Sequence, residues 1–130
     1  MTASYIRLKV DRDSVCAGDD CISHATSFVV ATSATLSDVL SAAQKACPLA
    51  GISGGKATWL IDTEGYGKGC IGVIAQQWNE PQLLINLNTA AEVVWKGTEG
   101  CLHFRYWCQS NPDAVFEAIK TGGELPSMYT

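Results

Sequence analysis

The chain has 130 residues, of which 47% are hydrophobic and 17% are charged, and its formal net charge is −4. This length is typical of one domain, and the apolar content is sufficient for one hydrophobic core. The nine basic residues are scattered along the chain, which argues against nucleic-acid binding, because that function needs a clustered basic surface.

The N-terminal segment and the cysteines indicate the compartment. Residues 1–13 lack the basic segment and apolar stretch of a signal peptide, and no apolar run approaches the roughly 20 residues that span a bilayer. We therefore expect a cytoplasmic protein that does not bind membranes and whose thiols stay reduced. Four of the six cysteines have apolar sequence neighbours and are expected to act as small buried hydrophobic residues: Cys47, Cys70, Cys101 and Cys108.

The first part of the chain predicts two strands and a helix. Residues 5–10, YIRLKV, alternate between polar and apolar side chains, which is typical of a half-buried strand. A polar loop over residues 12–24 leads to a β-branched segment, residues 26–32, which predicts the second strand. Apolar residues then recur at helical spacing over residues 33–47, where Thr35 can cap the helix.

The second part of the chain predicts mainly strands. Four further strands are expected at residues 57–62, 70–78, 82–87 and 101–108. The first two of these form a hairpin across a glycine-rich turn. Residues 89–94 fit a short helix and a linker equally well. Asn111 can cap a final helix that has proline at its first position and ends at Gly122.

This order of elements defines the fold class. Strict alternation of strands and helices is missing, so a doubly wound parallel sheet is not expected. We predict a single α+β domain over residues 1–130, with a mixed or antiparallel sheet of five to six strands and two helices. Two strands followed by a helix in the N-terminal half also suggest a β-grasp (ubiquitin-like) order.

Cys16, Cys21 and His24 share the polar loop and could in principle bind zinc. Structural zinc normally takes four ligands, and its cysteine pairs are two to four residues apart. The gap between Cys16 and Cys21 lies at the edge of that range, and no fourth ligand is evident. We predict two incidental thiols, with no metal and no cofactor. No recognised motif surrounds any Cys–His pair, so we expect a protein that is not an enzyme.

Acidic and aromatic residues are the candidates for partner binding. Asp13, Asp19 and Asp20 lie in the polar loop, where they form either Asx turns or an acidic contact patch for a basic partner. Trp107 falls on the polar side of its strand beside Arg105. It is either an exposed interface anchor or a ring stacked on that arginine.

Three segments carry a resemblance to a known family: RDSVCAGDD at residues 12–20, SGGKATW at 53–59 and VIAQQW at 73–78. Together they resemble small bacterial proteins in which such a loop follows the first strand. Through these the chain resembles the cytoplasmic immunity proteins that neutralise polymorphic toxins delivered between bacteria. The resemblance covers residues 6–85 and is weaker over residues 104–119.

The resemblance implies an immunity protein that occludes the active site or substrate surface of a toxin. Toxins that act on nucleic acids are basic, and an acidic inhibitor associates with them rapidly. The contact residues expected on this basis are Asp13, Asp19, Asp20 and Glu80, with Trp78 or Trp107 as an anchor. Two alternatives stay open. One is a small metal- or ligand-binding enzyme that uses the Cys16–His24 loop, and the other is a ubiquitin-like scaffold.

Overall fold

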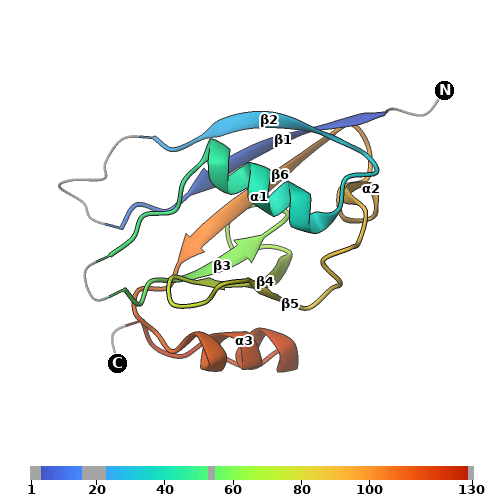
Figure 1. The fold of residues 1–130 in the computed structure, drawn as a ribbon. Coiled ribbons are helices and arrows are strands. Elements are labelled where there is room, and N and C mark those ends of the chain that lie inside the picture. Colours follow the sequence, from blue (N-terminus) through green and yellow to red (C-terminus); the bar gives the residue numbers. More distant parts are fainter. Residues whose placement is uncertain (1–3, 16–22, 53–54, 129–130) are drawn as a thin grey trace.

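The computed structural model describes residues 4–15, 23–52 and 55–128 (Figure 1). This part of the chain contains one six-stranded sheet and three helices. The strands are β1 (Tyr5–Arg12), β2 (Thr26–Ala31), β3 (Thr58–Asp62), β4 (Cys70–Ala75), β5 (Gln82–Leu83) and β6 (Glu99–Tyr106). The helices are α1 (Leu36–Ala46), α2 (Ala91–Val94) and α3 (Pro112–Thr121). Among these described helices, none has the length and apolar character needed to cross a membrane.

The sheet has the strand order β2-β1-β6-β3-β4-β5. Strand β1 is antiparallel to β2 and parallel to β6, and the remaining neighbours are antiparallel. The sheet is therefore mixed, and the α+β class is confirmed. An N-terminal hairpin, a helix that crosses the sheet and a parallel pair of the first and last strands make up the β-grasp order (Figure 1).

Helix α1 is capped by Thr35, as the sequence predicts, but it begins later than predicted. The hydroxyl of Thr35 accepts a hydrogen bond from the backbone N–H of Asp38 at 3.2 Å, so the first helical residue is Leu36 rather than the predicted residue 33. Asp38 in the first turn and Lys45 in the last turn both complement the helix dipole. The buried face consists of Leu36, Val39, Leu40 and Ala43. This apolar stripe attaches the helix to the sheet.

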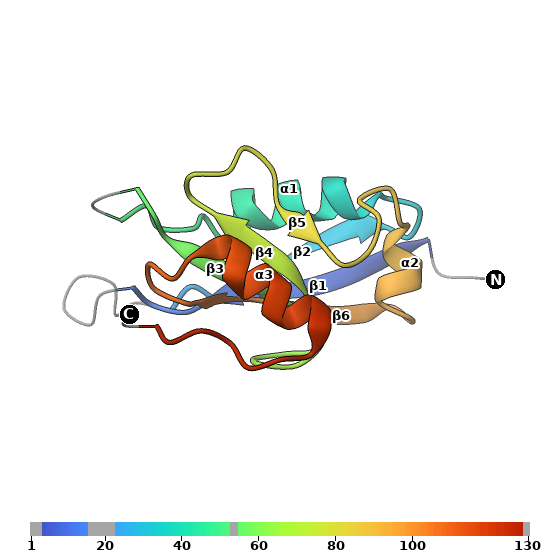
Figure 2. The same ribbon diagram turned by 90° about the horizontal axis from the view of Figure 1, so that it is seen from below.

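Two hydrophobic clusters lie on opposite faces of the sheet. On the face toward α1, alternate residues of β1 and β6 are buried: Ile6, Leu8, Val10, Leu102 and Phe104. On the other face, Leu60 of β3 and Val73 of β4 pack with Val115 of α3. Because both faces of β3 are covered, all five of its residues are buried. Figure 2 shows α3 lying across β3 and β4, away from α1.

The segment between β4 and β6 differs from the expectation. Strand β5 has two residues instead of the predicted 82–87, and α2 is a third helix. The reason is that the chain leaves the sheet to meet the start of α1. The backbone N–H of Leu36 donates to Thr89 at 2.8 Å, and that of Ser37 donates to Leu87 at 3.0 Å. In the antiparallel register, the residues after Leu83 would pair with the start of β4 at Cys70, and these bonds to α1 compete with that pairing.

Candidate binding face

Helix α3 covers only the β3–β4 half of its side of the sheet, and the β2–β1–β6 half carries exposed or half-buried side chains. The strand register identifies the residues on this surface, because directly paired residues point to the same face. We name this surface the open face. Its residues are Tyr5, Arg7, Lys9 and Asp11 of β1, Ser27, Val29 and Ala31 of β2, and Glu99, Cys101, His103 and Arg105 of β6.

The end of the open face that lies at the start of β1 is apolar. The side chain of Tyr5 is 64% exposed and that of Val29 is 60% exposed. Tyr5 pairs with Ala31, and Val29 pairs with Arg7, so these residues form two adjacent rows across β1 and β2. A large aromatic body and a β-branched side chain in this position supply apolar area that a partner could bury.

A charged groove of about 530 Å³ occupies the middle of the open face. It is lined mainly by side chains from the three strands: Arg7, Lys9, Ser27, Glu99 and Cys101. Arg7 lies opposite Glu99 in the register of β1 and β6, and Lys9 lies opposite Cys101. The groove therefore offers two cationic groups and one carboxylate to a bound molecule.

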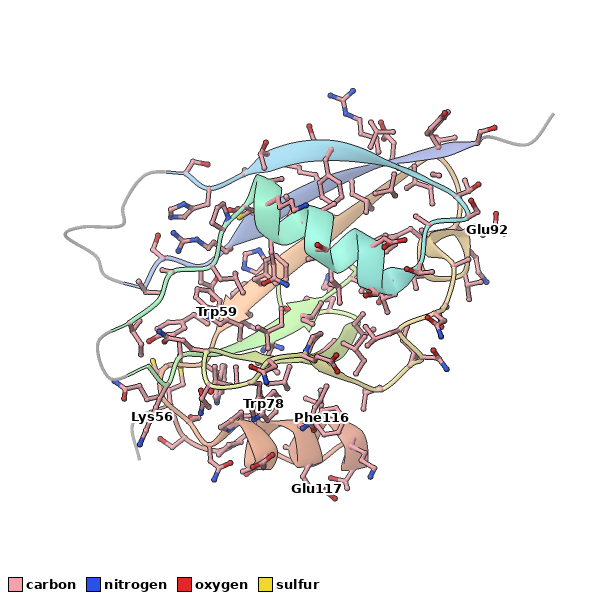
Figure 3. All side chains as sticks on the ribbon, viewed as in Figure 1. Lys56, Trp59, Trp78, Glu92, Phe116 and Glu117 are labelled. Atoms are coloured by element: carbon pink, nitrogen blue, oxygen red, sulfur yellow. The ribbon has the colours of Figure 1, made fainter. Side chains whose placement is uncertain are left out.

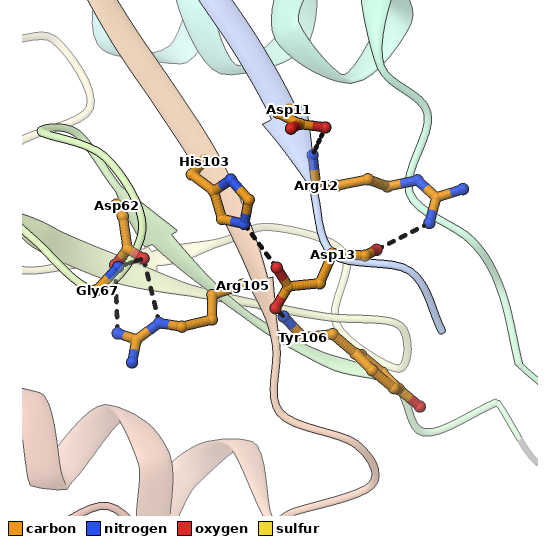
Figure 4. Close-up of polar contacts among 8 residues, drawn as sticks. All are labelled: Asp11, Arg12, Asp13, Asp62, Gly67, His103, Arg105 and Tyr106. Atoms are coloured by element: carbon orange, nitrogen blue, oxygen red, sulfur yellow. Dashed lines mark hydrogen bonds and ion pairs between the residues drawn. The ribbon is translucent and has the colours of Figure 1, made fainter. Parts of the chain in front are cut away.

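Asp13 fastens the end of β1 to β6 (Figure 4). Its Oδ1 lies 2.7 Å from Nε2 of His103, and its Oδ2 accepts the backbone N–H of Tyr106 at 3.0 Å. Its own backbone N–H donates to the carbonyl of Phe104 at 3.0 Å. Both carboxylate oxygens of Asp13 therefore have partners within the chain, which gives this residue a structural role at the polar end of the open face.

A second carboxylate, Asp62, is fully buried beside Arg105. Arg105 donates from Nε to Oδ2 at 3.1 Å and from Nη2 to Oδ1 at 3.3 Å. The backbone N–H of Gly67 also donates to Oδ2, at 2.8 Å. Such a two-pronged contact suits the planar guanidinium group. It also holds the turn after β3 against β6, as Figure 4 shows.

Tyr66 projects from this turn over the polar end of the open face. Its ring is 63% exposed and meets the ring of His103 edge-on, with centroids 5.3 Å apart. The guanidinium of Arg105 lies 5.8 Å from the Tyr66 ring and 5.6 Å from the Trp107 ring. Trp107 was predicted to be either an exposed interface anchor or a ring stacked on Arg105, and in the structure its ring lies against Arg105. The indole N–H of Trp107 also donates to the carbonyl of Pro126 at 2.7 Å.

A hollow of about 400 Å³ adjoins the polar end, and Asp13, Tyr66, Tyr106 and Cys108 are among the residues that line it. Cys108 has a left-handed backbone with φ of 56°. Burial raises the pKa of the Cys108 thiol, and a protonated thiol is a weak nucleophile. The pKa of Tyr106 is also raised, first by burial and then by the neighbouring Cys108.

The predicted contact residues do not share one surface. Asp13 and Trp107 lie at the polar end of the open face, whereas Trp78 and Glu80 line another hollow, of about 250 Å³, near the end of β4. Trp78 packs beside Phe116 of α3 (Figure 3), and Glu80 is exposed. Asp19 and Asp20 lie outside the described residues. Trp59, at the start of the predicted hairpin, is buried in the core.

Cys16 and Cys21 also lie outside the described residues, so the zinc-loop hypothesis concerns a segment of which only the final part, including half-buried His24, is described. Within the described ranges, no group of three or more His, Cys, Asp or Glu side chains could hold a metal ion. Cys47, Cys70, Cys101 and Cys108 are free thiols. Cys47 is buried as expected, whereas the other three are partly exposed.

Sequence reasoning overlooked the open face itself. Tyr5, Arg7 and Lys9 were recognisable as the polar side of an alternating strand, but such a side is ordinarily solvated. The usable signal was the tyrosine in this row, whereas the exposure of Val29 in the next strand is evident only from the structure. Tyr66 had no signal beyond its place in a glycine-rich turn, because its position depends on the hydrogen bond from Gly67 to Asp62.

Fold and surface together define an α+β protein with a β-grasp sheet, one half of which is open on the side opposite α1. Comparison with protein-family models, with curated proteins and with solved structures finds no match.

Proposed function

We propose that this protein is a binding protein of the immunity type, which neutralises a toxin domain by covering its active site or substrate surface. The observation that carries the proposal is the open face, where two well-exposed apolar side chains, Tyr5 and Val29, border a groove lined by Arg7 and Lys9. Interface centres are enriched in aromatic and arginine residues and depleted in other charged residues. The family resemblance supplies the toxin as the partner.

The charge of the chain supports a basic partner. A net charge of −4 attracts a basic toxin over long range and accelerates association, especially at low salt. Arg7 and Lys9 act at short range, where they pair with acidic groups on the partner. Steering by the whole molecule and pairing by the open face are therefore separate contributions to binding.

Two contact surfaces are compatible with this function. The first is the open face. The second is the Trp78–Glu80 hollow near β4. The acidic loop residues Asp19 and Asp20 lie outside the described residues and are tested separately. Asp13 belongs to the first by position, although its carboxylate is already bonded to His103 and Tyr106. Binding experiments can distinguish the two surfaces, because their residues can be changed independently.

The test begins with capture of a partner by the tagged protein from a lysate of its source cells, with identification by mass spectrometry. The captured protein is then expressed alone and together with this chain. We expect growth arrest in the first case and rescue in the second. A partner without toxicity, or toxicity that this chain leaves unchanged, contradicts the proposal.

Three variants then locate the contact surface in the same rescue assay. A double variant Tyr5→Ala, Arg7→Glu removes the open-face contacts, and Asp19→Lys with Asp20→Lys reverses the loop charges. Val93→Ala is the control, because Val93 is 61% exposed on α2 and belongs neither to the open face nor to the acidic loop. Loss of rescue in the first variant alone assigns binding to the open face, and loss in the second alone assigns it to the loop.

A small-ligand or enzymatic function is the second candidate, and the hollow beside Asp13 favours it. The Asp13–His103 pair can orient a proton there, and strained backbone such as that of Cys108 tends to occur at functional sites. Native mass spectrometry of the purified protein, combined with elemental analysis, tests this candidate. A stoichiometric small molecule or metal in place of a protein partner would support it.

The attachment of the residues after Gly122 argues against a ubiquitin-like carrier that conjugates through Gly122 and Gly123. Gly122 closes α3 in a left-handed conformation. The residues after it are fastened to the body of the protein, since Pro126 accepts from Trp107 and Ser127 accepts from Ser110 at 2.8 Å. A carrier that conjugates through Gly122 and Gly123 would have to lose this attached segment first.

A further inference from the structure

Strand β2 is an edge of the sheet, with β1 as its only partner in the described part of the chain. The backbone N–H of Thr32 donates to the carbonyl of Ser4 at 2.9 Å. Because hydrogen-bonded and non-hydrogen-bonded pairs alternate along an antiparallel hairpin, this bond shows which residues of β2 turn their backbone groups toward β1. Thr26, Phe28 and Val30 turn their N–H and C=O groups toward β1. Ser27, Val29 and Ala31 therefore turn theirs outward, away from the sheet.

These outward groups are open to a further strand. The carbonyl of Ala31 accepts from Ala34 at 3.0 Å, whereas the N–H of Ala31 and both backbone groups of Ser27 and Val29 have no partner among the described residues. Natural edge strands are usually protected by charged side chains, proline or bulges. The sequence of β2, TSFVVA, contains no charged residue and no proline.

We propose that the protein forms a two-fold symmetric dimer in which β2 pairs antiparallel with β2 of a second copy, centred on Val29. In this register Val29 lies opposite Val29 of the second copy, and the two residues exchange both backbone hydrogen bonds. Ser27 lies opposite Ala31 of the second copy, and the reverse pair is identical by symmetry. The outward groups of β2 are thus complementary to themselves, as a two-fold interface requires.

The side chains also favour a second copy. Val29 is 60% exposed, and in the dimer it packs against its symmetry mate on the open face. On the α1 side, half-buried Phe28 lies opposite Val30 of the second copy. Aromatic and β-branched pairs of this kind stabilise neighbouring strands. A charged peptide would find no complementary charge on β2.

Repulsion between the copies is small. The nearest cation in the central row is Arg7, which pairs with Val29 from the next strand. Three strand spacings separate it from Arg7 of the second copy, or about 14 Å at the usual spacing. This separation exceeds the screening length of about 8 Å at physiological salt. The dimer also joins the two open faces into one surface, although it does not depend on the proposed toxin.

Sedimentation velocity over a range of protein concentrations tests the dimer with Val29→Lys and its matched control Val93→Lys, which replaces an equally exposed valine on α2. We expect the wild type and Val93→Lys to dimerise as concentration rises. Two lysines directly opposite each other should weaken Val29→Lys dimerisation by about tenfold or more. A monomeric wild type at every concentration, or a dimer that Val29→Lys leaves intact, overturns the proposal.

Amide hydrogen exchange of the wild type supplies a second test that needs no variant. The N–H of Val29 is solvent-exposed in the monomer and hydrogen-bonded in the dimer. We expect its exchange to slow as the protein concentration rises, whereas the N–H of Phe28, which already bonds β1, changes little. Exchange at Val29 that is independent of concentration in a dimeric sample places the interface elsewhere and contradicts the β2 pairing.

Discussion

Two carboxylates, Asp13 and Asp62, hold the polar end of the open face from within the chain. Asp62 is fully buried, and the side chain of Arg105 is 14% exposed. A buried ion pair contributes little net stability when it forms, because desolvation offsets the attraction. Removal of one partner is a different matter, since it leaves the other charge without compensation in a poorly hydrated site.

Asp62→Ala is therefore expected to destabilise the protein by about 3 kcal/mol. It leaves the Arg105 guanidinium and the N–H of Gly67 without their acceptor. The measurement is urea denaturation of Asp62→Ala, Arg105→Ala and the double variant. We expect the double variant to lose less stability than the sum of the single variants, with a coupling of roughly 0.5–3 kcal/mol. Additive losses would show that the pair does not interact.

Asp13→Ala tests the other carboxylate. It removes the acceptor for the backbone N–H of Tyr106 and the partner of the His103 ring. A hydrogen bond to a charged group contributes about 1.5–3 kcal/mol to stability. We expect a loss of about 2 kcal/mol in thermal unfolding. Asp11→Ala is the control, because within the described residues the Asp11 carboxylate accepts only from the adjacent Arg12 N–H. Equal effects of the two changes would remove the proposed strand-fastening role of Asp13.

At the scale of elements, local patterns predicted most of the fold. Alternation over residues 5–10 and 101–108 and the capping signals of α1 and α3 are local, and the structure contains the corresponding elements. Helix α2 was undecided because its position depends on a distant contact. The side chain of Trp95, its C-terminal cap, packs on Gly100, where a Cβ would lie 2.4 Å from the indole. A local sequence pattern contains no information on such a contact between distant parts of the fold.

The candidate site was less predictable than the elements. Asp13 and Trp107 were selected for charge and exposure, but both are engaged within the chain. The open face arises because α3 stops over β3 and β4, and that limit follows from the strand order. Strand order depends on long-range pairing, in particular the parallel pairing of β1 with β6, which no local pattern in this sequence specifies.

The indole hydrogen bond of Trp107 is one of the contacts that attach the segment after α3 to the body of the protein. Trp107→Phe keeps an aromatic ring near Arg105 but removes the N–H that donates to Pro126. We expect a loss of about 1 kcal/mol in stability and faster amide exchange or proteolysis over residues 124–128. Trp78→Phe is the matched control, since Trp78 packs in the same cluster around α3 without contacting this segment through a hydrogen bond. Equal protection of the segment in both variants would contradict the assignment.

At the scale of the whole molecule, one thiol is associated with each hydrophobic cluster. Cys47 belongs to the cluster under α1, and Cys70 packs against the cluster under α3. Burial is the main cause that raises the pKa of both thiols above the ordinary value of 9.0. The folded state therefore favours the protonated thiol, whereas the unfolded chain releases the proton at lower pH.

This difference makes stability depend on alkaline pH. The contribution of each thiol is fully present below the unfolded pKa of about 9 and is lost as pH rises through the higher folded pKa. We expect the free energy of unfolding, measured with urea, to fall between pH 8 and pH 10. Cys47→Ala and Cys70→Ala should each lower stability at pH 8 yet flatten its decline, because the titrating group is gone. A decline that both variants retain in full would assign the alkaline sensitivity to groups other than these two thiols.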